Sequence, residues 1–107
     1  MKLMIIDDEK IIREGIHYSI SWGKIGIDIV KDYSGGEEAL KDFPEFLPDI
    51  VISDVKMEEM NGLEFFSEAK KIKNKRTPRI PHLKRHVGFF YFLFFVISHI
   101  FLNLLFH

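Results

Sequence analysis

Short apolar runs alternate with amphipathic stretches along the first 73 residues of the chain. Runs rich in Ile and Val predict strands over residues 2–7, 27–30 and 49–54. Apolar positions at helical spacing predict helices over residues 9–20, 37–43 and 62–73. Strand and helix thus alternate three times. Because right-handed crossovers place such helices on both faces of a parallel sheet, we expect an α/β fold.

Local signals locate the ends and the buried faces of these helices. Asp8 stands where the first helix needs an N-cap, and Pro44 should end the second helix at Phe43. Residues 57–61 form a loop before the third helix. The apolar face of that helix is predicted to consist of Leu63, Phe66, Ala69 and Ile72.

The alternating pattern stops after about residue 76. Pro78 and Pro81 interrupt residues 77–84, and proline cannot donate to a sheet, so we expect no interior strand there. Residues 88–106 are apolar and carry no formal charge, and as a helix they would span roughly 28 Å, close to the thickness of a bilayer core. We therefore predict a truncated domain over 1–76, a basic linker over 77–87 and a hydrophobic helical tail over 88–107.

Charge divides the chain at the same place. All 16 acidic residues lie within residues 1–69, whereas residues 70–107 contain only basic charged side chains. Basic residues directly before an apolar span place that side in the cytoplasm if the span inserts. A membrane anchor, a helix buried on the sheet and an aggregating segment all stay open for the tail. We expect a cytoplasmic protein, and the absence of cysteine fits a reducing compartment.

Carboxylates follow two of the predicted strands at the point where each strand ends. Asp7, Asp8 and Glu9 follow the first strand, and Asp54 ends the third. Since the carboxyl ends of parallel strands form one edge, we expect these acids to share a pocket there. Crowded carboxylates repel one another unless a cation neutralises them, and an all-oxygen set suits Mg²⁺. The alternative is that Asp7–Glu9 caps a helix and Asp54 serves a turn, which explains each acid alone but not their joint arrangement.

Four stretches in this order and spacing resemble a known family. They are Met4-Ile-Ile-Asp-Asp-Glu9, Gly36-Glu-Glu-Ala-Leu40, Pro48-Asp-Ile-Val-Ile-Ser-Asp54 and Met57-Glu-Glu-Met-Asn-Gly-Leu63. Residues 1–73 resemble the N-terminal three-fifths of the receiver domain of bacterial two-component response regulators. The resemblance implies a partial flavodoxin-like receiver with a parallel sheet, truncated after the third strand-helix unit. The connection around Trp22 further resembles regulators that carry an AraC-type DNA-binding output domain.

The resemblance also implies a role for individual residues. Asp54 matches the phosphoacceptor, which takes a phosphoryl group from a phosphohistidine on a sensor histidine kinase. Asp8 matches the direct Mg²⁺ ligand, and Asp7 the acid that acts on the metal through water. Lys56 stands where the family supplies a backbone carbonyl to the metal, and Gly62 matches the glycine that opens the next helix. Such a domain is a regulatory phosphoacceptor rather than an enzyme.

Departures from the family pattern are equally clear. Family members continue to a fourth strand ending in Thr or Ser and a fifth ending in Lys beside Pro, and neither Thr77 nor Lys84 fits these positions. We therefore expect residues after about Thr77 to come from another reading frame, through a frameshift, a broken gene or a gene-model error. The alternative function is a non-signalling fragment, or a membrane-tethered decoy that binds a sensor kinase.

Other classes of site receive less support from the sequence. The basic run Lys70–Arg85 lacks a helix-turn-helix, so we expect no direct nucleic-acid binding. His82 and His86 have a spacing that binds zinc on a helix, but the neighbouring Pro81 favours a solvated segment. Phosphatases of the haloacid dehalogenase type place a second Asp where this chain has Lys56, which argues against that class.

Overall fold

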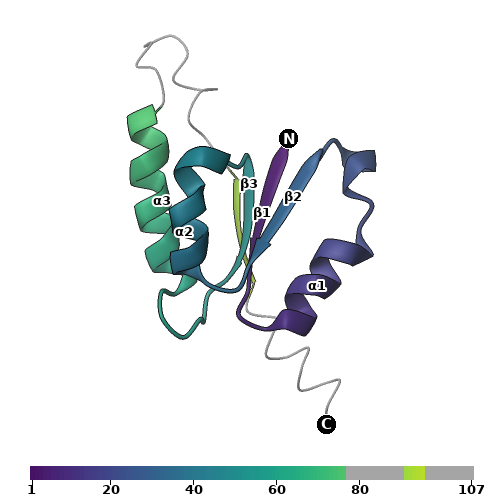
Figure 1. Ribbon diagram of the computed structural model, residues 1–107, viewed down its shortest axis with the longest axis horizontal. Coiled ribbons are helices and arrows are strands. Elements are labelled where there is room, and N and C mark those ends of the chain that lie inside the picture. The colour runs from purple at the N-terminus through teal and green to yellow at the C-terminus, as the bar shows by residue number, and fades with distance from the viewer. Residues whose placement is uncertain (77–90, 96–107) are drawn as a thin grey trace.

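The computed structural model describes residues 1–76 and 91–95, which form a parallel sheet with helices on both of its faces (Figure 1). The strands are β1 (Lys2–Ile6), β2 (Ile29–Tyr33), β3 (Ile50–Asp54) and β4 (Tyr91–Phe95). The helices are α1 (Lys10–Ser19), α2 (Gly36–Phe46) and α3 (Gly62–Arg76), with a short 3-10 helix at Trp22–Ile25. The strand order is β2-β1-β3-β4, so β1 and β3 are central and every pairing is parallel.

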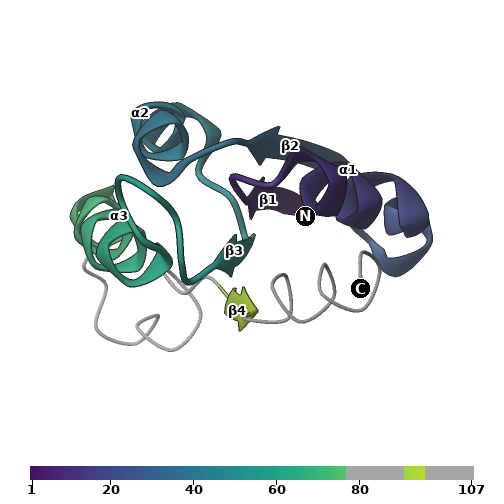
Figure 2. The same ribbon diagram turned by 90° about the horizontal axis from the view of Figure 1, so that it is seen from below.

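In Figure 2, α1 lies on one face of the sheet and α2 and α3 lie on the other, and each face carries its own buried apolar cluster. Successive side chains of β1 enter opposite clusters: Met4 and Ile6 pack with α2 and α3, whereas Leu3 and Ile5 pack on the other face. All four are fully buried. A strand covered on both faces is therefore apolar at every position, which is why the run was recognisable in the sequence.

The buried face of α3 agrees with the predicted one at Ala69 and Ile72, which pack in or against the core, and differs from it in the first part of the helix. Phe65 and Ala69 are fully buried, whereas Leu63 is 57% exposed and Phe66 is half-buried. The Phe65 ring packs edge-to-face on Phe43 of α2, with 5.9 Å between ring centroids. The prediction placed Leu63 first on the buried face. In the structure α2 lies against the side of α3 that carries Phe65, so Phe65 is buried in place of Leu63.

Two predicted helix ends are also wrong. α2 continues through Pro44 to Phe46, because Phe43 and Phe46 on either side of the proline are both buried in the core. Leu47 then ends the helix in the left-handed conformation, and its N–H donates to the Phe43 carbonyl at 2.9 Å. The N-cap of α1 is Glu9 rather than Asp8, and no side-chain hydrogen bond caps that helix.

The second strand lies later than the sequence suggested. It was predicted over residues 27–30 and is found at Ile29–Tyr33. Ile27 is buried ahead of the strand, where its N–H donates to the Trp22 carbonyl at 3.0 Å. The prediction began too early because the apolar Ile27 is buried before the strand begins. It ended too early because most residues of the strand are partly or fully exposed and the second half of it is polar.

Two predictions about the end of the chain are wrong: the sheet does not stop after three strands, and residues 91–95 are not helical but form a fourth strand. Tyr91–Phe95 pairs in parallel with Ile50–Asp54, with Phe95 opposite Asp54. A run of aromatic residues suits a strand as well as a helix, and the pairing covers the edge of β3 that three strands alone would expose. The predicted linker and the rest of the predicted tail lie outside the described residues. None of the helices described is long and apolar enough to cross a membrane.

We expect Phe65→Ala to lower the free energy of unfolding by about 3 kcal/mol, because it leaves a cavity in the α2–α3 core. Leu63→Ala on the same helix is the control and should change it by less than about 0.5 kcal/mol, since that side chain is largely exposed. Urea unfolding followed by circular dichroism measures both values. Equal losses in the two variants would contradict the described orientation of α3.

Candidate functional site

Three carboxylates meet at the carboxyl edge of the sheet, the edge seen in Figure 2. Ile6 of β1 pairs with Ser53 of β3, so the residues that follow them, Asp7 and Asp54, come side by side. Each of Asp7, Asp8 and Asp54 offers an oxygen, and the three oxygens lie within 4.8 Å of one another. Among the described residues this is the one group of three acids or histidines close enough to hold a metal ion.

The three acids differ in burial. Asp7 and Asp54 are fully buried, and Asp8 is exposed. Oδ1 of Asp7 accepts a hydrogen bond from the Glu9 N–H at 2.8 Å, but its buried Oδ2 has no hydrogen-bond partner in the described part of the chain. Leaving a buried acceptor unsatisfied is costly, so this oxygen is suited to a cation or a water bound to one.

Burial raises the pKa of Asp7 from its ordinary value of 3.8 to about 7. The N–H of Glu9 opposes this shift, while the negative charges of Asp54, Asp8 and Glu9 add to it. Near neutral pH, without a cation, Asp7 therefore holds a proton part of the time. A divalent cation would reverse these effects, since it favours the ionised carboxylate and displaces the proton.

The backbone around Asp54 is held by its neighbours in the chain. The N–H of the exposed Lys56 donates to Asp54 Oδ1 at 3.2 Å, and the Ser53 hydroxyl donates to the Asp54 carbonyl at 2.9 Å. Gly62, at the start of α3, packs so tightly here that a Cβ would clash with the Asp54 carbonyl oxygen. Its N–H donates to the Val55 carbonyl at 3.0 Å, which brings the loop back to the strand end.

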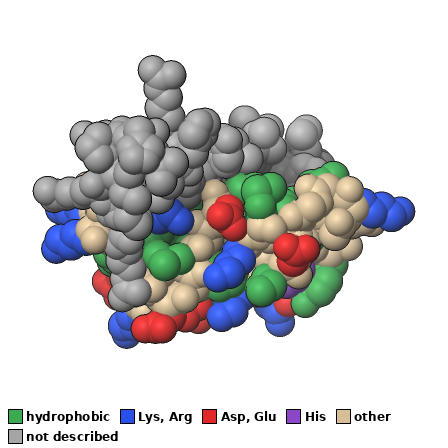
Figure 3. Space-filling model, turned by 90° about the horizontal axis from the view of Figure 1, so that it is seen from above, with side chains coloured by type: hydrophobic (Ala, Val, Ile, Leu, Met, Phe, Trp, Pro, Cys, Tyr) green, Lys and Arg blue, Asp and Glu red, His purple; other side chains and the backbone are tan. Residues whose placement is uncertain are grey.

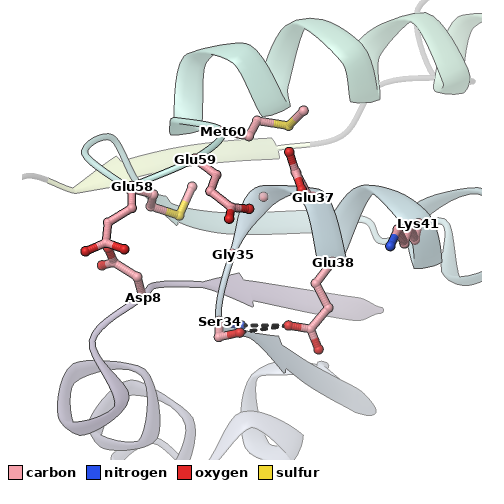
Figure 4. Close-up of a pocket in the computed structure, with 11 residues that line it drawn as sticks. Asp8, Ser34, Gly35, Glu37, Glu38, Lys41, Glu58, Glu59 and Met60 are labelled. Atoms are coloured by element: carbon pink, nitrogen blue, oxygen red, sulfur yellow. Dashed lines mark hydrogen bonds between the residues drawn. The ribbon is translucent and has the colours of Figure 1, made fainter.

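A hollow of about 370 Å³ opens beside the acids (Figure 4). The turns that follow β1 and β2, the first half of α2 and the loop before α3 form its walls, which carry Asp8, Gly35, Glu37, Lys41, Glu58 and Glu59 among others. Figure 4 shows the Asp8 and Glu58 carboxylates pointing toward one another at its rim. Asp8 belongs to both the acid group and this hollow, so a molecule in the hollow would lie next to a bound cation.

The opposite end of the molecule has a different character. Figure 3 looks onto the amino ends of the strands, where apolar, acidic and basic side chains alternate over the described surface without a large patch of one sign.

Not every residue at the site was foreseen. The sequence interpretation missed Gly36, whose Cβ would lie 3.0 Å from the Met60 carbonyl oxygen, and Arg13, whose Nη1 donates to the Asp7 carbonyl at 2.8 Å. No sequence motif predicts the contact of Gly36 or that of Arg13, because each depends on how a helix packs on a loop that is distant from it or turns back on it. His82 and His86 lie outside the described residues.

Comparisons with known proteins agree with this geometry. The family model of the response regulator receiver domain matches residues 3–82. The transcriptional regulatory protein HptR of Staphylococcus aureus is 36% identical over 67 residues, which make up 63% of this chain and 27% of that regulator. The chain therefore matches little more than a quarter of the length of this relative.

Solved structures share the fold. A two-component transcriptional regulator AraC from Clostridium phytofermentans has a TM-score of 0.71 at 20% identity, covering 96% of this chain and 71% of that one. The receiver domain of the histidine kinase CKI1 from Arabidopsis thaliana, complexed with Mg²⁺ and BeF₃⁻, has a TM-score of 0.62 at 25% identity. That match covers 75% of this chain and 61% of the other.

We expect Asp7→Asn to stabilise the protein at pH 8 in EDTA. The pKa of Asp7 is about 7 in the folded protein against 3.8 ordinarily, so only the folded state keeps this proton between about pH 4 and pH 7. The stability it contributes is present at low pH and lost as the pH rises through 7. The variant should therefore gain roughly 2 to 4 kcal/mol over the wild type at pH 8 and progressively less toward pH 4. Urea unfolding at several pH values measures the difference.

Glu45→Gln, at an exposed position of α2, is the control for Asp7→Asn and should show no pH-dependent gain. A difference between Asp7→Asn and the wild type that stays constant from pH 4 to pH 8 would contradict the elevated pKa.

Gly62→Ala should lower the free energy of unfolding by about 1–3 kcal/mol, because the new methyl group must displace the Asp54 backbone. Gly15→Ala is the matched control: nothing lies within 4 Å of its Cβ position, and removing a glycine from a helix should stabilise α1 by up to about 1 kcal/mol. Thermal unfolding compares the two. If both substitutions stabilise the protein, the described close packing of Gly62 against the Asp54 carbonyl is contradicted.

Proposed function

Because the chain belongs to the response regulator receiver domain family, we propose that it accepts a phosphoryl group on Asp54 in a Mg²⁺-dependent reaction. The observation that carries the proposal is the group of three carboxylates, two of them fully buried, whose oxygens lie within 4.8 Å of one another. Burying two acids side by side is unfavourable in a purely structural role, since each charge opposes the other.

The residues present fit Mg²⁺ on chemical grounds. Mg²⁺ prefers oxygen ligands and takes one or two carboxylates together with waters and phosphate oxygens. Asp8, Asp54 and the Lys56 backbone carbonyl would hold the ion, with Asp7 acting through water. The Oδ2 of Asp7 supports this assignment, because within residues 1–76 and 91–95 it is a buried acceptor without a hydrogen-bond partner and therefore needs a donor or a cation. When bound, the ion neutralises negative charge on the phosphoryl oxygens and on the acids.

Asp54 serves as the nucleophile in this proposal. Its carboxylate oxygen forms a bond to phosphorus, and the bond from phosphorus to the donor breaks, so that the leaving group keeps the electron pair. With a phosphohistidine the leaving group is an imidazole, and with acetyl phosphate it is acetate. The Lys56 N–H holds Oδ1 of Asp54 and so orients the carboxylate.

The donor and the wider role follow from the same proposal. A sensor histidine kinase would supply the phosphoryl group, and a DNA-binding output domain of the kind found in transcriptional regulators would read the result. HptR is named as a transcriptional regulator, but the similarity covers only 27% of its length. The proposal for this chain therefore concerns phosphoryl acceptance, with transcriptional control as its expected setting.

We expect the wild-type chain to incorporate phosphoryl groups from ³²P-labelled acetyl phosphate in the presence of Mg²⁺ and not in EDTA. Asp54→Asn should reduce incorporation at least about 100-fold, because the nucleophile is removed. Glu45→Gln, which alters an exposed acid of α2 outside the lining of the hollow, should stay within about threefold of the wild type. Equal labelling of the Asp54→Asn variant, or unchanged labelling in EDTA, would refute the proposal.

A further inference from the structure

Arg13, in the first part of α1, reaches back over the turn that carries the acids. Its Nη1 donates to the Asp7 carbonyl at 2.8 Å, and its own backbone N–H donates to the Glu9 carbonyl at 2.9 Å. The side chain is only 15% exposed. The Arg13 side chain therefore ties the Asp7 carbonyl to α1, while the bond to the Glu9 carbonyl is the first backbone hydrogen bond of that helix.

The carbonyl that Arg13 contacts belongs to the planar peptide unit joining Asp7 to Asp8. The strand side of this unit is fixed as well, since the Asp7 N–H donates to the Tyr33 carbonyl at 3.1 Å. Asp8 itself is exposed, so the direction of its side chain depends on the backbone that precedes it. Holding the carbonyl of Asp7 thus restrains the peptide plane from which the Asp8 backbone extends.

Arg13 is oriented in turn by Asp32 of β2. Arg13 Nε lies 3.9 Å from Asp32 Oδ2, and His17 Nδ1, one helical turn further along α1, lies 3.2 Å from the same oxygen. Asp32 is half-buried, with 29% of its side chain exposed. It stands between two side chains of α1 and keeps the guanidinium directed toward the strand end.

From these contacts we infer that Arg13, oriented by Asp32, is a positioning residue for the cation site. It acts through the Asp7–Asp8 peptide and brings the Asp8 carboxylate to the other two acids. This inference rests on the proposed function, because it assumes that the acids bind Mg²⁺. Mutating a residue that orients the ligands of a metal ion typically weakens metal binding by about 10- to 100-fold.

Charge alone predicts the opposite effect, which makes the inference testable. Arg13 is a cation near an anionic site, so removing its charge should strengthen Mg²⁺ binding if only electrostatic forces matter. If Arg13 positions Asp8, the same change should weaken binding. The sign of the effect separates the two explanations.

The experiment measures Mg²⁺ affinity of the 107-residue chain by isothermal titration calorimetry. We expect Arg13→Gln to weaken binding about tenfold, and Arg13→Lys about threefold, since one ammonium group cannot contact both the Asp7 carbonyl and Asp32. Lys10→Gln removes the same charge from an exposed position of α1 and should leave the affinity unchanged or slightly higher. At saturating Mg²⁺, phosphorylation of Arg13→Gln from acetyl phosphate should return to within about twofold of the wild type, which a general loss of structure would not allow.

A double-mutant cycle tests the role of Asp32. Asp32→Asn should weaken binding about threefold, and the double variant with Arg13→Gln should bind no more weakly than Arg13→Gln alone, because both changes disturb one arrangement. Circular dichroism establishes that each variant is folded at the temperature of titration, and Arg13→Lys decides the result if Arg13→Gln is not. Wild-type affinity in the Arg13 variants, tighter binding, or independent effects of the two changes would overturn the inference. Absence of Mg²⁺ binding by the wild type would instead overturn the proposed function.

Discussion

Electrostatic repulsion among three carboxylates at one edge of a sheet is the constraint on which the functional part of this structure depends. Asp7 and Asp54 are fully buried and Asp8 lies beside them, so the group is unfavourable unless a proton or a cation is present. Burial, and to a smaller extent the charges of Asp54, Asp8 and Glu9, raise the pKa of Asp7 to about 7. Phosphoryl acceptance, as we propose it, depends on this repulsion. A cation that neutralises the carboxylates also lowers the electrostatic cost of bringing a negatively charged phosphoryl group to the site.

Close backbone packing holds the acids in this unfavourable arrangement. Gly62 lets α3 begin directly against the Asp54 carbonyl, and the N–H of Lys56 donates to the Asp54 carboxylate. On the other side of the site, Arg13 and the N–H of Glu9 hold the turn after β1. The energy for this order comes from the apolar clusters on both faces of the sheet, which fix the strands from which the acids project.

The apolar segment after the receiver motifs shows how tertiary context overrides local pattern. Read alone, residues 88–106 have the length and composition of a hydrophobic helix. In the structure, Tyr91–Phe95 is instead the fourth strand and pairs along the whole of β3. The family pattern ends its fourth strand in Thr or Ser, whereas β4 of this chain ends at Phe95.

The sequence by itself determined the α/β class, the first three strand-helix units and the convergence of Asp7, Asp8 and Asp54. It could do so because strands buried on both faces are continuously apolar, and because parallel strands deliver their last residues to one edge. Tertiary structure alone decided the passage of α2 through Pro44, the choice of Phe65 over Leu63 for the core and the strand at Tyr91–Phe95. It also decided the contacts of Arg13 and Gly62 with the backbone of the site. These features depend on which surfaces meet across the fold, and no local periodicity records that information.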